Sequence, residues 1–173
     1  MLKESEERRT RFQPGALRLR AEVRPSDVET VRAIVVSTGF FAAHEVAVAV
    51  ELVQERLHRG PASGYLFIFA ELDGRTVAYA CYGPVACTVG SFDLYWIVVH
   101  NEFRGRGLGR RLLGEVERRV AAGGGRRIYV ETSSRDQYAP TRRFYESCGY
   151  VAEARLADFY APGDAKIIYS RQM

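Results

Sequence analysis

The sequence has few of the side chains that bind metals, and it has almost no lysine. Three cysteines and three histidines occur in 173 residues, and none of them follows a metal-ligand spacing, so no metal site is expected. Lysine stands only at positions 3 and 166, and arginine carries nearly all the positive charge. Because the arginines are spread along the chain without a run of five basic residues, nucleic-acid binding is only a minor alternative.

Long apolar segments are missing as well. No stretch approaches the roughly 18 unbroken apolar residues that a membrane span needs, so no membrane partner is expected. Residues 1–15 are charged and have no apolar core, which argues against a secretory signal and predicts a flexible N-terminal tail. The odd number of cysteines favours a reducing cytoplasmic location. The chain length and its 47% of apolar residues suit one compact domain.

The spacing of apolar and turn-forming residues predicts alternating strands and helices. A strand at 92–99 is almost entirely apolar and is therefore expected to be central and buried on both faces. A helix at 107–122 carries an apolar stripe on one face. The other strands are expected at 17–24, 64–72, 76–82, 127–132, 150–155 and 166–171, and the other helices at 26–37, 45–58 and 139–147.

A glycine-rich turn, Arg-Gly-Arg-Gly-Leu-Gly at 104–109, joins the apolar strand to the helix at 107–122. A helix N-terminus presents free amides and a partial positive charge, which favour a bound anion. Glycines let phosphate oxygens approach these amides, and the neighbouring arginines add positive charge. The P-loop is excluded because the turn has no lysine, and the dinucleotide fingerprint is excluded because Arg110 stands where its last glycine would be.

These residues resemble the signature of the GNAT superfamily of N-acetyltransferases, Arg/Gln-x-x-Gly-x-Gly/Ala, which stands here as Arg104-x-x-Gly107-x-Gly109. The segment from Phe144 to Tyr150 resembles the second motif of that family. The resemblance implies an α/β (α+β) fold, with a single mixed, mostly antiparallel twisted sheet of about seven strands flanked by about four helices. It assigns residues 16–173 to one N-acetyltransferase domain.

The resemblance also implies acetyl-CoA as co-substrate, with its pyrophosphate on the amides of the turn and its pantetheine arm along the preceding strand. Many family members have an asparagine before the second motif where this chain has Tyr138, so Tyr138 or Arg142 is expected to contact the CoA arm instead. The other predicted CoA-binding residues are Ile97, Val98, Val99, Arg104, Gly105, Arg106, Gly107, Leu108, Gly109 and Arg110.

For the chemistry, the resemblance implies that Tyr145 protonates the leaving CoA thiolate, as a phenol with a pKa of about 10 can do at neutral pH. A carboxylate, reached directly or through water, is the usual group that takes the proton of the amine. Glu131 is the first candidate because burial in an apolar strand would raise its pKa, and because it resembles a glutamate of the ribosomal-protein alanine N-acetyltransferases. Asp93 is the second candidate, and either carboxylate can instead be structural.

The expected function is transfer of an acetyl group to a primary amine by direct attack. The acceptor is a small molecule or an amino group of a peptide or protein. The sequence is also compatible with a homodimer. A non-catalytic acyl-CoA-binding or sensor domain is the alternative, against which the retained Tyr145 argues. The turn at 158–164 is expected either to line an acceptor pocket that favours a cationic amine or to be a plain hairpin loop. His44 and His100 are expected at the surface or in caps, and Cys148 is expected to be buried.

Overall fold

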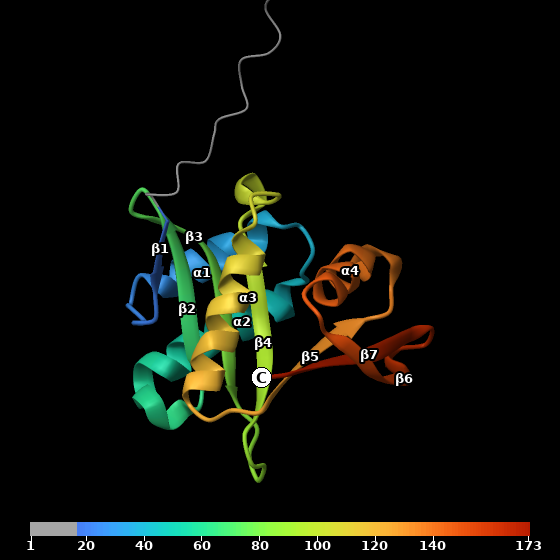
Figure 1. The fold of residues 1–173 in the computed structure, drawn as a ribbon. Helices are drawn as coiled ribbons and strands as arrows, with labels where there is room; N and C mark the ends of the chain where they lie inside the picture. Colours follow the sequence, from blue (N-terminus) through green and yellow to red (C-terminus); the bar gives the residue numbers. More distant parts are fainter. Residues whose placement is uncertain (1–16) are drawn as a thin grey trace, which may run out of the picture.

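The computed structural model describes residues 17–173, which form one mixed sheet of seven strands with four α-helices (Figure 1). The strands lie in the order β1-β2-β3-β4-β5-β7-β6. Neighbouring strands are antiparallel except for β4 and β5, which are parallel. The predicted fold class is therefore confirmed. The tail predicted at 1–15 lies outside the described residues.

Strands and helices follow one another in the predicted order. The strands are β1 Leu17–Arg20, β2 Leu66–Leu72, β3 Arg75–Pro84, β4 Ser91–Val99, β5 Arg127–Ser133, β6 Val151–Ala161 and β7 Asp164–Gln172. The α-helices are α1 Asp27–Ser37, α2 Ala43–Arg59, α3 Leu108–Ala122 and α4 Ala139–Ser147, and short 3-10 helices lie at Gly60–Ser63, Asn101–Phe103 and Asp136–Tyr138.

Two strand boundaries differ from the prediction by more than two residues. β1 ends at Arg20 and not at position 24, because the chain turns there toward α1, where the amide of Arg24 donates to Asp27 at 2.7 Å. β6 runs on to Ala161, which pairs with Asp164 across a short turn. The segment expected to be one turn at 158–164 is therefore mostly the end of a strand.

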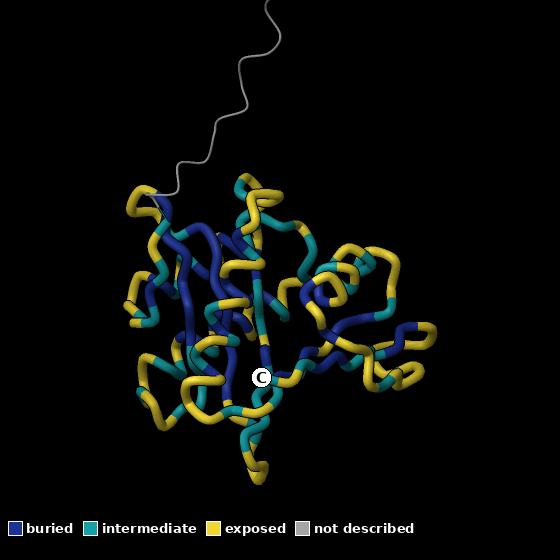
Figure 2. The backbone as a smooth tube through the Cα atoms, viewed as in Figure 1, coloured by how far each residue is buried: buried dark blue, intermediate teal, exposed yellow. Residues whose placement is uncertain are grey.

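Each face of the sheet has its own apolar core, because successive side chains of a strand point to opposite faces. On one face Phe67 and Phe69 of β2 pack with buried residues of α1 and α2. On the other face Ile68 and Ala70 pack with buried residues of α3, α4, β5 and β7. In Figure 1, α3 lies in front of the sheet and α1 and α2 lie behind it. Figure 2 shows the continuous burial along β2 and β3.

The parallel pair β4–β5 separates halfway along its length. Residues 91–94 of β4 pair with 127–130 of β5, and within the described chain β4 continues to Val99 paired only with β3. The two halves of the sheet diverge from this point (Figure 1). The expectation that 92–99 is buried on both faces is wrong, since only Leu94 and Val98 of the strand are buried. Tyr95 is 41% exposed there, because β5 no longer lies beside it.

Candidate functional site

The glycine-rich turn forms the N-terminus of α3 just beyond the end of β4. Gly107, with φ of 76°, directly precedes the first helical residue. The amide of Arg111 donates to the carbonyl of Gly107 at 3.1 Å, so the amides of residues 108–110 have no acceptor within the helix. Gly105 has φ of 74°, and a Cβ added at either glycine would meet nothing within 4 Å. Backbone conformation, not lack of space, is what requires glycine here.

One cleft of about 1260 Å³ connects this turn to the gap between β4 and β5. Its wall contains every predicted site residue except Arg106 and Arg142. The predicted residues that line it are Asp93, Ile97, Val98, Val99, Arg104, Gly105, Gly107, Leu108, Gly109, Arg110, Glu131, Tyr138 and Tyr145. Residues predicted from separate stretches of sequence are therefore brought to one continuous surface.

Arg106 and Arg142 point to other partners. Arg106 donates to the carbonyl of Glu102 at 3.3 Å and lies over the ring of Phe103. Arg142 donates from Nη1 to the carbonyl of Ser133 at 2.8 Å, so it ties α4 to the end of β5. The structure brings neither arginine to the cleft wall, and their contact with CoA stays a prediction.

Tyr145 is held on α4 inside a cluster of tyrosines. Its ring centroid lies 5.6 Å from that of Tyr150 and 6.2 Å from that of Tyr169, and the residue is 4% exposed. Burial raises the pKa of its phenol well above the ordinary range. Its hydroxyl forms no hydrogen bond with residues 17–173, although the residue lines the cleft. Tyr145 therefore keeps its proton and has a donor that nothing in the described fold uses.

Glu131 does not have the burial that was predicted for it. Its side chain is 50% exposed, and Oε2 lies 2.6 Å from Nζ of Lys166. The core under α1 and α2 takes its strand residues from β2, β3 and β4, so no helix packs over this part of β5. The prediction of a buried carboxylate was wrong because the alternation of the strand does not reveal which of its faces is covered.

Asp93 lies beside Glu131 but has no partner. It is in register with Tyr129 of β5, which places Asp93, Tyr129 and Glu131 on the same face of the sheet. Within residues 17–173 its carboxylate accepts no hydrogen bond and has no cation within 4.0 Å. Burial raises the pKa of Asp93, and the charge of Glu131 adds to the effect, while Lys166 opposes it.

Most of the aromatic side chains that line this cleft were not predicted from the sequence. In the ladder between β3 and β4, Cys81 faces Trp96 and Tyr82 faces Leu94, so Tyr95 is the extra residue of a β-bulge. A bulge re-aims a side chain, and its position depends on the register between two strands, which the sequence does not show. Tyr129 carried a signal because it stands two positions before Glu131. Tyr160 belongs to the segment 158–164, for which an acceptor pocket was one of the two expectations, and it does line the cleft. The aromatic residues at this end of the cleft are Phe41, Tyr65, Tyr95, Trp96, Tyr129 and Tyr160.

The minor expectations for single residues hold where the structure describes them. His100 caps the 3-10 helix that follows β4, accepting the amide of Glu102 on Nδ1 at 3.3 Å. His44 is exposed at the start of α2, and Cys148 is buried.

In the described part of the chain, no three His, Cys, Asp or Glu side chains are grouped to hold a metal ion. None of the helices there combines the length and the apolar character needed to cross a membrane.

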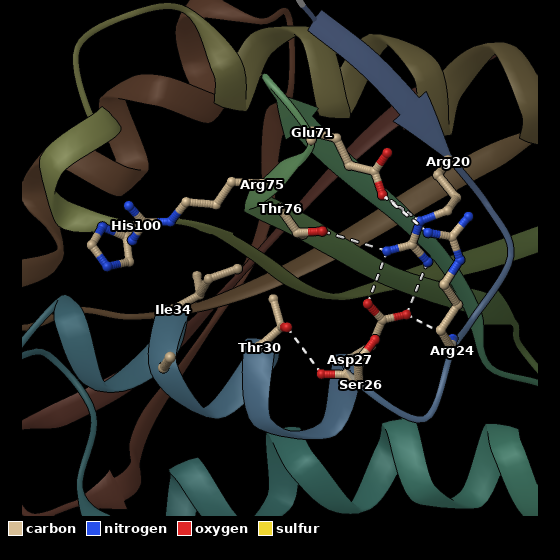
Figure 3. A pocket seen from close by; sticks show the side chains of 12 residues that line it. Arg20, Arg24, Ser26, Asp27, Thr30, Ile34, Glu71, Arg75, Thr76 and His100 are labelled. Carbon is tan, nitrogen blue, oxygen red and sulfur yellow. Dashed lines mark hydrogen bonds and ion pairs between the residues drawn. The ribbon is translucent and has the colours of Figure 1, made fainter.

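A second hollow, of about 360 Å³, lies beside β1 and α1 (Figure 3). The guanidinium of buried Arg20 donates to both oxygens of Asp27 at 2.8 and 2.9 Å and to Glu71 at 2.6 Å. Figure 3 shows both carboxylates pointing at this one cation. The three residues come from β1, α1 and β2, so the network joins these elements. The guanidinium of Arg20 is already engaged by the two carboxylates.

The N-terminus of α3, with its free amides, lies beside the point where the parallel strands β4 and β5 separate, and both line one cleft. The Acetyltransferase (GNAT) family matches residues 29–150. The chain belongs to this family and is an acyltransferase.

Solved structures resemble this chain over most of its length. An acetyltransferase of the GNAT family from Desulfovibrio desulfuricans is 51% identical, covers 91% of this chain and 99% of its own, and superposes with a TM-score of 0.89. An aminoglycoside 6'-N-acetyltransferase in complex with coenzyme A is 19% identical over 90% of this chain and 96% of its own, with a TM-score of 0.72. The ribosomal-protein-S18-alanine N-acetyltransferase of Escherichia coli is 19% identical over 90% of this chain and 93% of its own, with a TM-score of 0.69. The two structures at 19% identity show a shared fold only. No curated protein matches the chain.

Proposed function

We propose that this protein transfers the acetyl group of acetyl-CoA to a primary amine by direct attack. The observation that carries the proposal is that the free amides of residues 108–110 and the unbonded hydroxyl of Tyr145 line the same cleft. The first group suits the pyrophosphate of the donor and the second suits its sulfur. A fold relative, the aminoglycoside 6'-N-acetyltransferase, was solved with coenzyme A.

The donor half of the cleft fits an extended molecule with a pyrophosphate at one end. Amides at the α3 N-terminus are positive donors, and the side chains of Arg104 and Arg110 lie in the same wall. Residues 97–99 of β4 pair with β3 on one edge, and the divergence of β5 leaves the groups on the other edge free. Those groups are available to hydrogen-bond an amide-containing arm as a neighbouring strand would.

The transfer needs a group that gives a proton and a group that takes one. The amine nitrogen forms a bond to the acetyl carbon, the carbon–sulfur bond breaks, and Tyr145 donates its phenolic proton to the departing thiolate. An ammonium acceptor loses one proton to solvent before attack and a second one after it. We assign removal of the second proton to Asp93, directly or through water, and a proton from solvent restores the phenol of Tyr145. Glu131 is the weaker candidate, because its carboxylate is ion-paired to Lys166 at 2.6 Å.

Thiol release from acetyl-CoA in the presence of a panel of amines tests the proposal, with Tyr145→Phe as the main variant. Loss of the general acid should lower kcat about 100-fold, while the dissociation constant for acetyl-CoA stays unchanged. Tyr169→Phe is the matched control, because it removes a hydroxyl from the same cluster that is bound to Glu146 at 2.9 Å and should leave kcat near the wild-type value.

Two outcomes would count against this reading. Unchanged turnover in Tyr145→Phe would show that another group is the acid. Tight acetyl-CoA binding with no thiol release for any amine would favour the alternative, a sensor domain that binds the donor without turnover.

A further inference from the structure

We infer that the acceptor is a primary amine with one positive charge on an apolar or aromatic body, and with no carboxylate beside the amine. The inference deepens the proposed function and rests on it, since it assumes that an amine is the acceptor. It follows from the side chains that line the end of the cleft beyond the divergence of β4 and β5. The relevant features are the aromatic walls, one carboxylate that has no partner among residues 17–173, and the absence, from this end of the described cleft wall, of a lysine or arginine that is not paired with a carboxylate.

The aromatic walls come from two separate pairs. Tyr65 and Tyr95 meet edge to face with ring centroids 5.5 Å apart, and Phe41 and Trp96 lie at 5.1 Å. All four line the cleft, although Tyr65 and Phe41 are far from β4 in sequence. Aromatic rings give apolar contact area and also attract a nearby cation through their faces. A ligand with an apolar body and an ammonium group satisfies both properties.

Asp93 is placed to receive that ammonium group. It stands two positions before Tyr95, and burial together with the negative charge of Asp93 raises the pKa of Tyr95 to about 12. The carboxylate and the aromatic wall are therefore close enough to act on one ligand. An ion pair with a bound ammonium would give Asp93 the partner that it lacks in residues 17–173.

Two of the other three carboxylates of the described cleft wall are already paired with a cation. Glu131 is paired with Lys166 at 2.6 Å, and Asp164 is paired with Arg135 at 3.0 Å. Each pair is neutral as a unit, so it adds little attraction for a second or third positive charge on the ligand. One unmatched carboxylate therefore suits an amine with a single charge better than a polycation.

Glu45 is the remaining carboxylate in the wall, and it has a role in the fold. Its Oε2 accepts the amide of Ala42 at 2.8 Å, which caps the start of α2. Moving Glu45 onto a ligand would leave that amide without its acceptor. Asp93 thus stays the one carboxylate of the described cleft wall that no interaction in the fold employs.

The same pairing excludes a good site for a free amino acid. An α-carboxylate needs its own cation, and the nearby cations, Lys166 and Arg135, are bound to Glu131 and Asp164. Arg104 and Arg110 belong to the wall beside the α3 N-terminus, which the donor pyrophosphate would occupy. A carboxylate on the acceptor would face Asp93 without compensation, and like charges repel.

Three amines that share one phenyl body, together with one polycation that lacks it, test the inference in the full chain. Acetylation of 2-phenylethylamine and phenylalanine amide should proceed with kcat/KM at least about tenfold higher than acetylation of phenylalanine or of the polycation kanamycin. Phenylalanine amide is the decisive compound, because it differs from phenylalanine only in lacking the negative charge. Higher kcat/KM for phenylalanine or kanamycin would overturn the inference, while the proposed function would stand because an amine was acetylated.

Binding provides a readout that does not depend on turnover. Calorimetry with 2-phenylethylamine and CoA-loaded protein should show a dissociation constant about tenfold higher in Asp93→Asn than in the wild type. Asp73→Asn, the same change at an exposed residue of the β2–β3 turn outside the cleft wall, is the control with little change. Equal binding by Asp93→Asn would overturn the role of Asp93. Thiol release with none of the amines, despite acetyl-CoA binding, would instead refute the proposed function itself.

Discussion

The most direct test of the donor half is the replacement of a single glycine in the turn. Gly107→Ala places a Cβ on a residue with φ of 76°, and a left-handed conformation costs an L-residue about 1–2 kcal/mol. Because the added Cβ would meet nothing within 4 Å, no clash adds to that cost. Alanine also restricts the unfolded chain and recovers about 0.4–1 kcal/mol. The net expectation is a loss of about 1 kcal/mol in the free energy of unfolding.

Gly114→Ala is the matched control in the same helix. Gly114 lies inside α3, is exposed and has open space where a Cβ would be. The same substitution there should raise the free energy of unfolding by about 1 kcal/mol, because alanine is the better helix former. The two variants should therefore differ by about 2 kcal/mol in urea unfolding, with opposite signs relative to the wild type.

The two variants should also differ in their affinity for acetyl-CoA. Relaxation of Gly107→Ala out of the left-handed region would turn the amides of residues 108–110 away from the donor, so its dissociation constant for acetyl-CoA should rise about tenfold, or about 1.4 kcal/mol. Gly114→Ala should bind acetyl-CoA as the wild type does, and calorimetry measures both. If Gly107→Ala bound acetyl-CoA with unchanged affinity, the idea that these amides hold the pyrophosphate would have to be abandoned.

Three further predictions concern the carboxylates and the buried cation. The pKa of Asp93 is raised, so its carboxyl group stays protonated to a higher pH than an ordinary carboxyl group with a pKa of about 3.9. The rate of amine acetylation should therefore rise with pH as Asp93 loses its proton, at a pH above that ordinary value. In Asp93→Asn this step of the pH–rate profile should vanish. Asp93→Asn should lower kcat/KM more than Glu131→Gln, and the reverse order would restore Glu131 as the base. Arg20→Met should destabilise the fold by about 3–5 kcal/mol in urea unfolding, because it leaves buried Asp27 without a cation and Glu71 with only the longer contact of Arg24 at 3.8 Å. Exposed Arg24→Met should cost less than about 1 kcal/mol.

The sequence was sufficient for the parts of the molecule whose residues are contiguous. The apolar strand, the glycine-rich turn and the amphipathic helix follow one another within residues 92–122, so local rules on periodicity and helix termini apply to them directly. The order of strands and helices was predicted for the same reason. The family resemblance added the class of the sheet, single, mixed and mostly antiparallel, which periodicity alone does not determine.

What the sequence did not reveal depends on pairing between distant segments. Glu131 looks like a buried residue in its strand, but whether a helix covers that face is decided by the placement of α1 and α2. The bulge at Tyr95 arises from a one-residue shift against β3, and no residue type marks it. The contact of Arg20 with Glu71 joins positions 51 residues apart. In each case the local residue pattern is compatible with several long-range arrangements, and the fold selects one.

The same difference between local and long-range structure explains why the sequence predicts the donor well and the acceptor poorly. The donor is held mainly by backbone amides at one helix N-terminus and along one strand, so few side chains are constrained and a short pattern describes them. The acceptor end is built from side chains of the α1–α2 connection, of Tyr65 just before β2, and of β4, β5 and β6, and each can change without disturbing the amides that hold the donor. Acceptor preference therefore has to be derived from charge balance in the folded cleft, where Asp93 is the carboxylate that the described residues leave unmatched.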